Sequence, residues 1–305
     1  KYDAEGVGGV LNITTNKEVT GGASAADGQY GTVRLQGGTR GFGGGVFYNA
    51  QQGKWSFGVN ANANNRNSPG TVTDDERIQQ TAAGNTVTSN HSETKLKTPM
   101  AMINLNAGYE LDSLNTFSAT VGYMRFGMGY DGLSTMNMLM PDGSSFGYQG
   151  NTYQKNNRNS ITATFDWSHN WANNPERMLV ISYQFSGSPS INNSTNSYGG
   201  AVIPGFDLTD RKTTGGSNSL NNILQADFST PIGGRSTLNA GLKFQNRHNS
   251  SNQTNFLWNG TDFIETAVGS MDYHFKNNIG AAYLEYEGKF GSFGLKAGMR
   301  YEHTW

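Results

Sequence analysis

Two short acidic segments and one histidine are spaced for acid–base chemistry. Asp272–Tyr273–His274 places a carboxylate and an imidazole two residues apart, and Asp74–Asp75–Glu76 supplies further acids elsewhere in the chain. On a strand, residues two apart face the same side, so Asp272 and His274 would point together. An imidazole held by a carboxylate can act as a general base, which would suit hydrolysis.

Other catalytic and metal chemistries lack their residues. The chain has no cysteine, which excludes disulfides, thiolate zinc sites and cysteine nucleophiles. The five histidines show no His-Glu-x-x-His spacing. Glycines at 6, 8 and 9 and at 41 and 43–45 do not follow a buried strand and open a helix, so they indicate turns rather than a phosphate loop. We therefore expect no catalytic residue, no metal and no cofactor.

The methionines leave two interpretations open. Met136, Met138 and Met140 fall in one expected loop, and Met124 and Met128 come just before it. Thioethers can bind soft metals, but packing at the rim of a lumen is the favoured interpretation.

The elements that must position these groups show period-two alternation. From Phe117 to Tyr123 every odd residue is apolar and every even residue is small or polar, which is typical of a strand with one apolar face. Eleven such strands are predicted, at 28–39, 45–51, 54–66, 96–111, 115–127, 158–171, 177–188, 218–230, 236–248, 277–289 and 292–304. No run of about 18 apolar residues is present, which excludes a membrane-spanning helix.

The connections alternate between short and long. Tight turns are expected near Gly53, Ser113, Asn174, Gly234 and Gly291, so the chain repeats a two-strand unit. The intervening segments 67–95, 127–157, 189–217 and 249–276 are rich in Asn, Ser, Gly and Thr and are predicted to be long loops at one end. Short turns opposite long loops indicate an outer-membrane barrel, an all-β, antiparallel, up-and-down architecture.

Composition supports a membrane barrel over its soluble alternatives. The 35 Asn and 41 Gly make up a quarter of the chain, and residues of the hydrophobic class reach only 35%. A β-sandwich or a lipocalin-like barrel would bury its apolar face in a core. With 22 basic and 23 acidic residues, the chain has no electrostatic footprint for nucleic acid. Aromatic residues close to the short turns suggest an interfacial girdle: Trp55, Phe57, Phe117, Trp167, Trp171, Phe290 and Phe293.

The run Tyr2–Lys17, YDAEGVGGVLNITTNK, resembles the segment that closes the plug domain of TonB-dependent outer-membrane receptors. It departs from that family's pattern in Leu11 and in Thr15–Asn16 before the lysine. The tail from Ala281 to Glu302 is similar to a mid-barrel hairpin of the outer-membrane β-barrel family. The resemblance implies a 22-stranded barrel with an internal plug. Residues 1–20 would then end the plug, and 21–305 would form the N-terminal part of the barrel. Eleven is an odd strand count, so we expect the natural protein to continue.

The resemblance implies a non-enzymatic uptake protein in the outer membrane of a Gram-negative bacterium. Its partners would be outer-membrane lipid, a TonB-type energy-transducing complex acting on the plug, and an unidentified small ligand. Two alternatives stay open: a plain porin-like barrel, and a barrel hydrolase of the omptin type that would use the Asp272–His274 pair.

Two residue sets are the candidates for function. The ligand contacts are predicted to be aromatic residues in the outer loops: Tyr130, Tyr148, Tyr153, Tyr198, Phe206, Phe256, Trp258 and Phe263. The lumen is predicted to carry the charges Asp166, Asp227, Glu285, Glu287, Lys296 and Arg300.

The last hairpin gives a sharper prediction. A two-residue turn at Gly291–Ser292 pairs Phe290 with Phe293 and sets Glu287 opposite Lys296.

Overall fold

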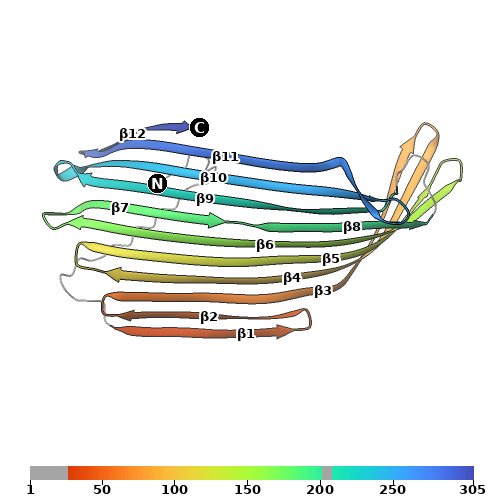
Figure 1. The fold of residues 1–305 in the computed structure, drawn as a ribbon, viewed down its shortest axis with the longest axis horizontal. Coiled ribbons are helices and arrows are strands. Elements are labelled where there is room, and N and C mark those ends of the chain that lie inside the picture. The colour runs from red at the N-terminus through yellow and green to blue at the C-terminus, as the bar shows by residue number, and fades with distance from the viewer. Residues whose placement is uncertain (1–26, 201–207) are drawn as a thin grey trace.

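The computed structural model describes residues 27–200 and 208–305, which form one antiparallel sheet (Figure 1). The plug-like run of residues 1–20 lies outside the described residues. The strands are β1 Gly28–Gly38, β2 Gly41–Gln52, β3 Trp55–Thr81, β4 Gly84–Glu110, β5 Asn115–Leu139, β6 Ser145–Trp171, β7 Asn174–Gly187, β8 Ser190–Gly200, β9 Arg211–Pro231, β10 Ser236–Trp258, β11 Phe263–Phe290 and β12 Phe293–Thr304. A single 3-10 turn, η1 Gly233–Arg235, joins β9 to β10. Within these ranges no helix is long and apolar enough to cross a bilayer.

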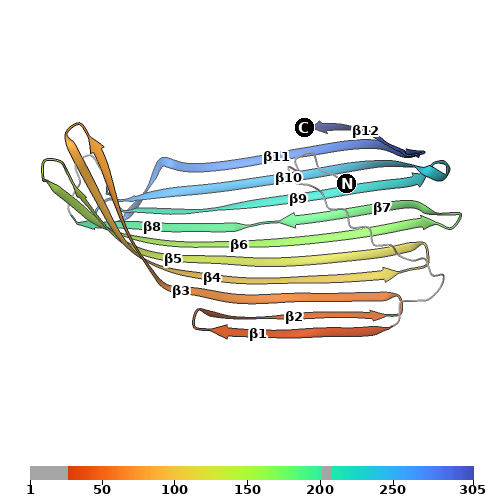
Figure 2. The same ribbon diagram turned by 180° about the vertical axis from the view of Figure 1, so that it is seen from behind.

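Strands β7 and β8 occupy one position in the sheet. Both lie between β6 and β9, and they are separated by Ser188–Pro189. Proline has no N–H to donate to a ladder, which explains the break. Within the described residues the twelve strands therefore fill eleven positions, which agrees with the predicted count of eleven. Strands β1 and β12 lie at opposite edges, and each pairs with a single neighbour among the described strands (Figure 2).

The predicted long loops were wrong. Three of the four segments are mainly continuations of the flanking strands, closed by turns at 82–83, 140–144 and 259–262, and the fourth contains β8 and the start of β9. The β3 and β4 ladder, for example, runs to Thr81↔Gly84. The composition of these segments is typical of loops, but strand preference depends on the partners across the ladder, so Asn, Ser and Thr continue the pairing here. At roughly 3.3 Å per residue, the 27 residues of β3 span about 90 Å.

The tight turns at the opposite end were predicted correctly. They fall at 53–54, 111–114, 172–173, 232–235 and 291–292. The Asp112 carboxylate accepts hydrogen bonds from the backbone N–H of Leu114 and of Asn115, each at 2.8 Å. The hydrogen bond from the Asn115 side-chain amide, together with these backbone bonds, lowers the pKa of Asp112. Such an Asx turn closes β4 onto β5.

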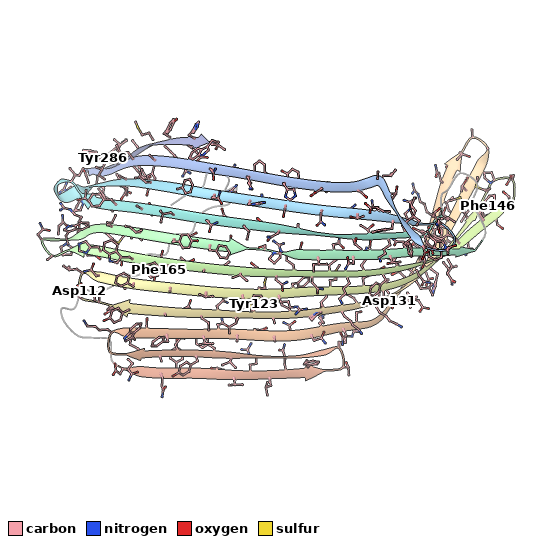
Figure 3. All side chains as sticks on the ribbon, in the orientation of Figure 1. Asp112, Tyr123, Asp131, Phe146, Phe165 and Tyr286 are labelled. Atoms are coloured by element: carbon pink, nitrogen blue, oxygen red, sulfur yellow. The ribbon has the colours of Figure 1, made fainter. Side chains whose placement is uncertain are left out.

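The register divides the sheet into two faces, shown with all side chains in Figure 3. The apolar face carries the odd residues of β5, and Val121 is 47% exposed there with no protein neighbour to cover it. The polar face carries the even residues, such as Ser118 and Thr120, opposite Asp166 and Thr164. The alternation predicted from 117 to 123 is therefore confirmed.

Aromatic residues line up across the apolar face beside the tight turns. Trp55, Tyr109, Phe117 and Trp167 are successive partners in the register of four neighbouring strands. The rings of Trp55 and Tyr109 are 4.3 Å apart between centroids. Rings at one height on an apolar face are typical of an interfacial girdle.

Candidate functional site

Two carboxylates of the polar face, Asp166 and Asp227, are held by neutral neighbours. Asp166 on β6 accepts a hydrogen bond from Ser118 Oγ at 3.3 Å. Asp227 on β9 accepts one from the Tyr283 hydroxyl and one from Gln225 Nε2, the latter at 2.8 Å. Tyr283 and Asp227 both face Gly241 on the strand between them, and this glycine leaves room for their contact.

The last hairpin has the predicted register. Phe290 pairs with Phe293 and Glu287 pairs with Lys296. The backbone of the turn is of type II′, in which only the first central residue has a positive φ. Gly291 has φ +66°, and Ser292 does not have a positive φ, since among the described residues only glycines do. Phe290 and Phe293 lie on the apolar face and the charges on the polar face.

Arg300 forms its ion pair within its own strand rather than across the hairpin. Glu285 is diagonal to Arg300 in the register, but the Arg300 guanidinium binds Glu302 on its own strand at 2.7 Å. Residues two apart on a strand share a face, so the closer carboxylate captures the guanidinium.

Amide and hydroxyl groups dominate the polar face of β3 to β6. Asn60 and Asn104 are cross-strand partners, and Thr120 Oγ1 donates to Asn106 Oδ1 at 3.1 Å. Asn49 and Asn106 lean over Gly58, where a Cβ would lie 2.7 Å from Asn49 Oδ1. This part of the wall therefore offers mainly neutral hydrogen-bond donors and acceptors.

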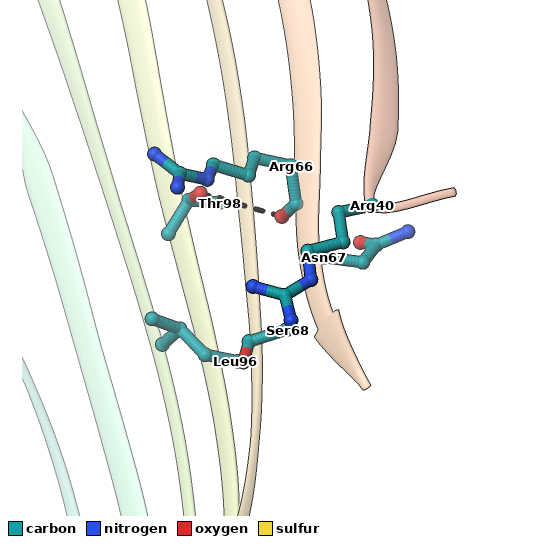
Figure 4. A pocket seen from close by; sticks show the side chains of 6 residues that line it. All are labelled: Arg40, Arg66, Asn67, Ser68, Leu96 and Thr98. Carbon is teal, nitrogen blue, oxygen red and sulfur yellow. Dashed lines mark hydrogen bonds between the residues drawn. The ribbon is translucent and has the colours of Figure 1, made fainter. Parts of the chain in front are cut away.

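A small recess lies beside the turn where β2 begins, at the level where β3 continues past it (Figure 4). Its volume is about 70 Å³, and Arg40 and Arg66 both line it, together with Asn67, Ser68, Leu96 and Thr98. The Asn67 N–H donates to the Arg40 carbonyl at 2.7 Å, which fixes the turn against β3. Neither guanidinium forms an ion pair within residues 27–200 and 208–305. The recess can therefore accept a small anion.

The predicted aromatic ligand contacts that the structure describes lie on strands rather than in loops, and they do not form one site. Tyr130, Tyr148 and Tyr198 lie on strands and share the polar face, where the rings of Tyr148 and Tyr198 meet edge-on at 5.8 Å. Tyr153 lies on the opposite face.

The remaining aromatic candidates lie near the end of the β10–β11 hairpin. Phe256 and Trp258 occupy the same face of β10 as the apolar-face residues, and Phe263 packs on Trp258 at 5.1 Å. Lys212 lies over the Phe256 ring at 5.7 Å. Phe206 lies outside the described residues. Because the sequence predicts these segments to be loops, it does not predict that the residues lie on opposite faces. On a strand, odd and even residues face opposite sides of the sheet.

The Asp272–His274 pair forms as its spacing predicts. Nε2 of His274 lies 3.2 Å from Asp272 Oδ1. Both residues, however, lie on the apolar face of the sheet, which the even residues of this part of β11 form. Both side chains are exposed. In the part of the chain that the structure describes, no hydrogen bond or ion pair links them to 74–76.

The acids at 74–76 have local partners. Asp74 Oδ1 is 2.6 Å from His91 Nδ1 across the β3–β4 ladder, and Glu93 Oε1 is 3.6 Å from His91 Nε2. The hydrogen bond to Asp74 is the main reason that the pKa of His91 rises above its ordinary value. An open recess of about 350 Å³ adjoins this group.

In the described ranges, no group of three His, Cys, Asp or Glu side chains is arranged to hold a metal ion. The methionines predicted in a loop lie instead on β5, apart from Met140 in the turn that follows. Met124, Met128, Met136 and Met138 all occupy even positions and so face the polar side.

Residues 172–305 match the outer membrane protein beta-barrel family. This range covers β7 to β12, including the last hairpin. The chain is an outer-membrane β-barrel protein of Gram-negative type. Its apolar face therefore meets lipid, and its polar face lines the interior. No curated protein matches the sequence at a significant level.

Sequence reasoning missed the recess at Arg40 and Arg66. The two residues are 26 apart, and a two-residue turn at 39–40 brings them together by ending β1 and β2 early. Alternation alone does not reveal where a neighbouring strand stops. The signal that was available is Arg40 between Gly38 and Gly41, a sequence typical of a hairpin turn.

Proposed function

We propose that this protein is an outer-membrane uptake receptor of the TonB-dependent kind and that it carries no catalytic site. The observation that carries the proposal is the polar face. It continues from the tight turns to the distal ends of β3 to β6, far beyond the roughly 25 Å that an apolar band occupies. A barrel wall of this length encloses a deep, wet interior, which suits passage of a ligand.

The width of the sheet supports a large barrel. Eleven strand positions already exceed a small eight-stranded barrel, and β1 and β12 each have an unpaired edge among the described residues. Edges in lipid need partners because no water is available to their backbone groups. A receptor-sized barrel supplies those partners, and the plug-like run at residues 1–20 would block its interior.

The ligand contacts follow from the faces. Tyr148 and Tyr198 form a ring pair on the polar face, and the Arg40–Arg66 recess opens on the same face. We assign these four residues as the first ligand contacts. The proposed partners are outer-membrane lipid, a small ligand at these residues, and a TonB-type complex that acts through the plug.

Conductance in a planar bilayer tests the receptor against a plain porin. A plugged receptor should pass little current as the full-length protein, and deletion of the whole plug, up to and including residues 1–20, should open steady channels. Normal insertion of the deletion variant, checked by its heat-dependent mobility in gels, is the control. Equal, steady conductance before and after the deletion would favour the porin.

A further inference from the structure

Three cations lie on the lipid-facing side just past the apolar band. On β5 the apolar-face residues run from Phe117 to Tyr123, and the next residue on that face is Arg125. Lys97 on β4 and Lys155 on β6 lie on the same face, four residues further from the band, where both are opposite Gly129. The Tyr123 hydroxyl donates to Asn159 Oδ1 at 3.0 Å. Because tyrosine has an apolar ring and a polar hydroxyl, Tyr123 marks the outer edge of the apolar band.

Lys97 and Lys155 flank a position that has no side chain. Gly129 is the register partner of Lys97 on one side and of Lys155 on the other. The two lysines are thus separated by two strand spacings, about 9–10 Å. Arg125 lies four residues from Gly129 on the same face of β5. The three cations surround an open patch of backbone, which we call the cation triangle.

The positive charge of the triangle is not offset locally. All three side chains are exposed, and none forms an ion pair with a carboxylate in the ranges 27–200 and 208–305. The nearest acid on this face of β5 is Asp131, which is diagonal to Lys97 and Lys155 in the register but forms no ion pair with either within the described ranges.

We propose that the cation triangle binds the phosphate groups of a phosphorylated glycolipid in the outer leaflet. The site lies where the acyl chains of such a lipid would cover Val121 and Tyr123 while its headgroup reaches the cations. Ammonium and guanidinium groups bind phosphate well, and the gap at Gly129 leaves room for it between the lysines. The inference is independent of what the interior transports.

Lipid retention in nanodiscs tests the site. The full-length protein in phosphatidylcholine nanodiscs would be offered bisphosphorylated lipid A or its dephosphorylated form, and bound lipid measured by native mass spectrometry. The variant Lys97→Gln/Arg125→Gln/Lys155→Gln removes the triangle. The matched control Arg34→Gln/Arg158→Gln/Arg247→Gln removes three cations from the polar face.

We expect the bisphosphorylated lipid to bind the wild type and the control alike, and the triangle variant on the order of 100-fold more weakly. Equal retention of the dephosphorylated lipid would overturn the proposal, as would unchanged binding by the triangle variant. Displacement by inorganic phosphate at the lipid's own concentration would also overturn it, since that identifies a soluble-anion site.

Gly129→Asp gives a second, fold-neutral test. A Cβ at Gly129 would meet only Lys97 Cβ, at 3.9 Å, so the strand accepts a side chain there. The new carboxylate should compete for both lysines and reduce lipid retention at least tenfold, whereas Gly129→Ala should retain most of it. Full retention by Gly129→Asp would show that the lipid binds elsewhere.

Discussion

The Lys296 ammonium lies closer to Glu285, its diagonal neighbour, than to Glu287, its direct partner in the register. The two distances are 3.0 and 3.8 Å. Lys296 thus lies between two carboxylates on one strand and screens them from each other. Removing the cation should cost more than the loss of one exposed ion pair, because two like charges then share a face.

We therefore predict that Lys296→Met destabilises the β11–β12 hairpin by about 1 kcal/mol. Urea unfolding in detergent, followed by tryptophan fluorescence, measures the change. The double variant Glu285→Gln/Lys296→Met should recover part of the loss, since it also removes one of the two repelling carboxylates. Equal loss in both variants would show that repulsion plays no part.

The two faces of β5 should respond differently to their surroundings. A spin label at position 121 should be relaxed by lipid-soluble oxygen, and one at position 120 by a water-soluble nickel reagent. Val121 lies on the lipid-facing side and Thr120 on the interior side. Matching accessibilities would contradict the membrane orientation of the whole sheet.

The raised pKa of His91 makes the β3–β4 contact pH-dependent. Asp74 and Glu93 favour the protonated ring, so its stabilising contribution is fully present below the ordinary histidine pKa near 6.5 and is lost as pH rises through the folded value. A titration of the His91 ring signals by NMR should give a midpoint above the ordinary value. In Asp74→Asn the midpoint should fall, whereas Asp75→Asn, which alters a neighbour bonded to Asn90, should change it little.

His274 should be dispensable. Its partner Asp272 is on the lipid-phase side of β11, away from the interior. We expect His274→Ala to leave uptake by the full-length protein near normal, measured in cells that depend on it. A peptidase activity lost in this variant would instead support the omptin-type alternative.

The sequence predicted what alternation controls and missed what composition obscures. The faces of β5, β6 and β10 follow directly from the period, and Gly291–Ser292 set the last register because glycine permits a II′ turn. The distal halves of the strands were assigned to loops because Asn, Ser and Gly are turn formers when considered singly.

Cross-strand information decided the rest. The β3 bulge between Ser68 and Thr71 reverses which residues of β3 face each side, and it leaves Asp74 across from His91. The aromatic candidates likewise lie on two faces, because odd and even residues of a strand point to opposite sides of the sheet. These details depend on the register, that is, on which residues of two neighbouring strands lie opposite each other. The sequence of one strand alone does not determine the register.

Strands that pair in the sheet are consecutive in the sequence, if β7 and β8 are counted together as the strand between β6 and β9. Each hairpin can therefore close its ladder against the one made just before it, and no segment needs to wait for a distant partner. This low contact order keeps the loop-closure entropy small at every stage. The hairpins should therefore add to the sheet in sequence order. A chain that stops folding part-way would then expose the edge of the last strand added.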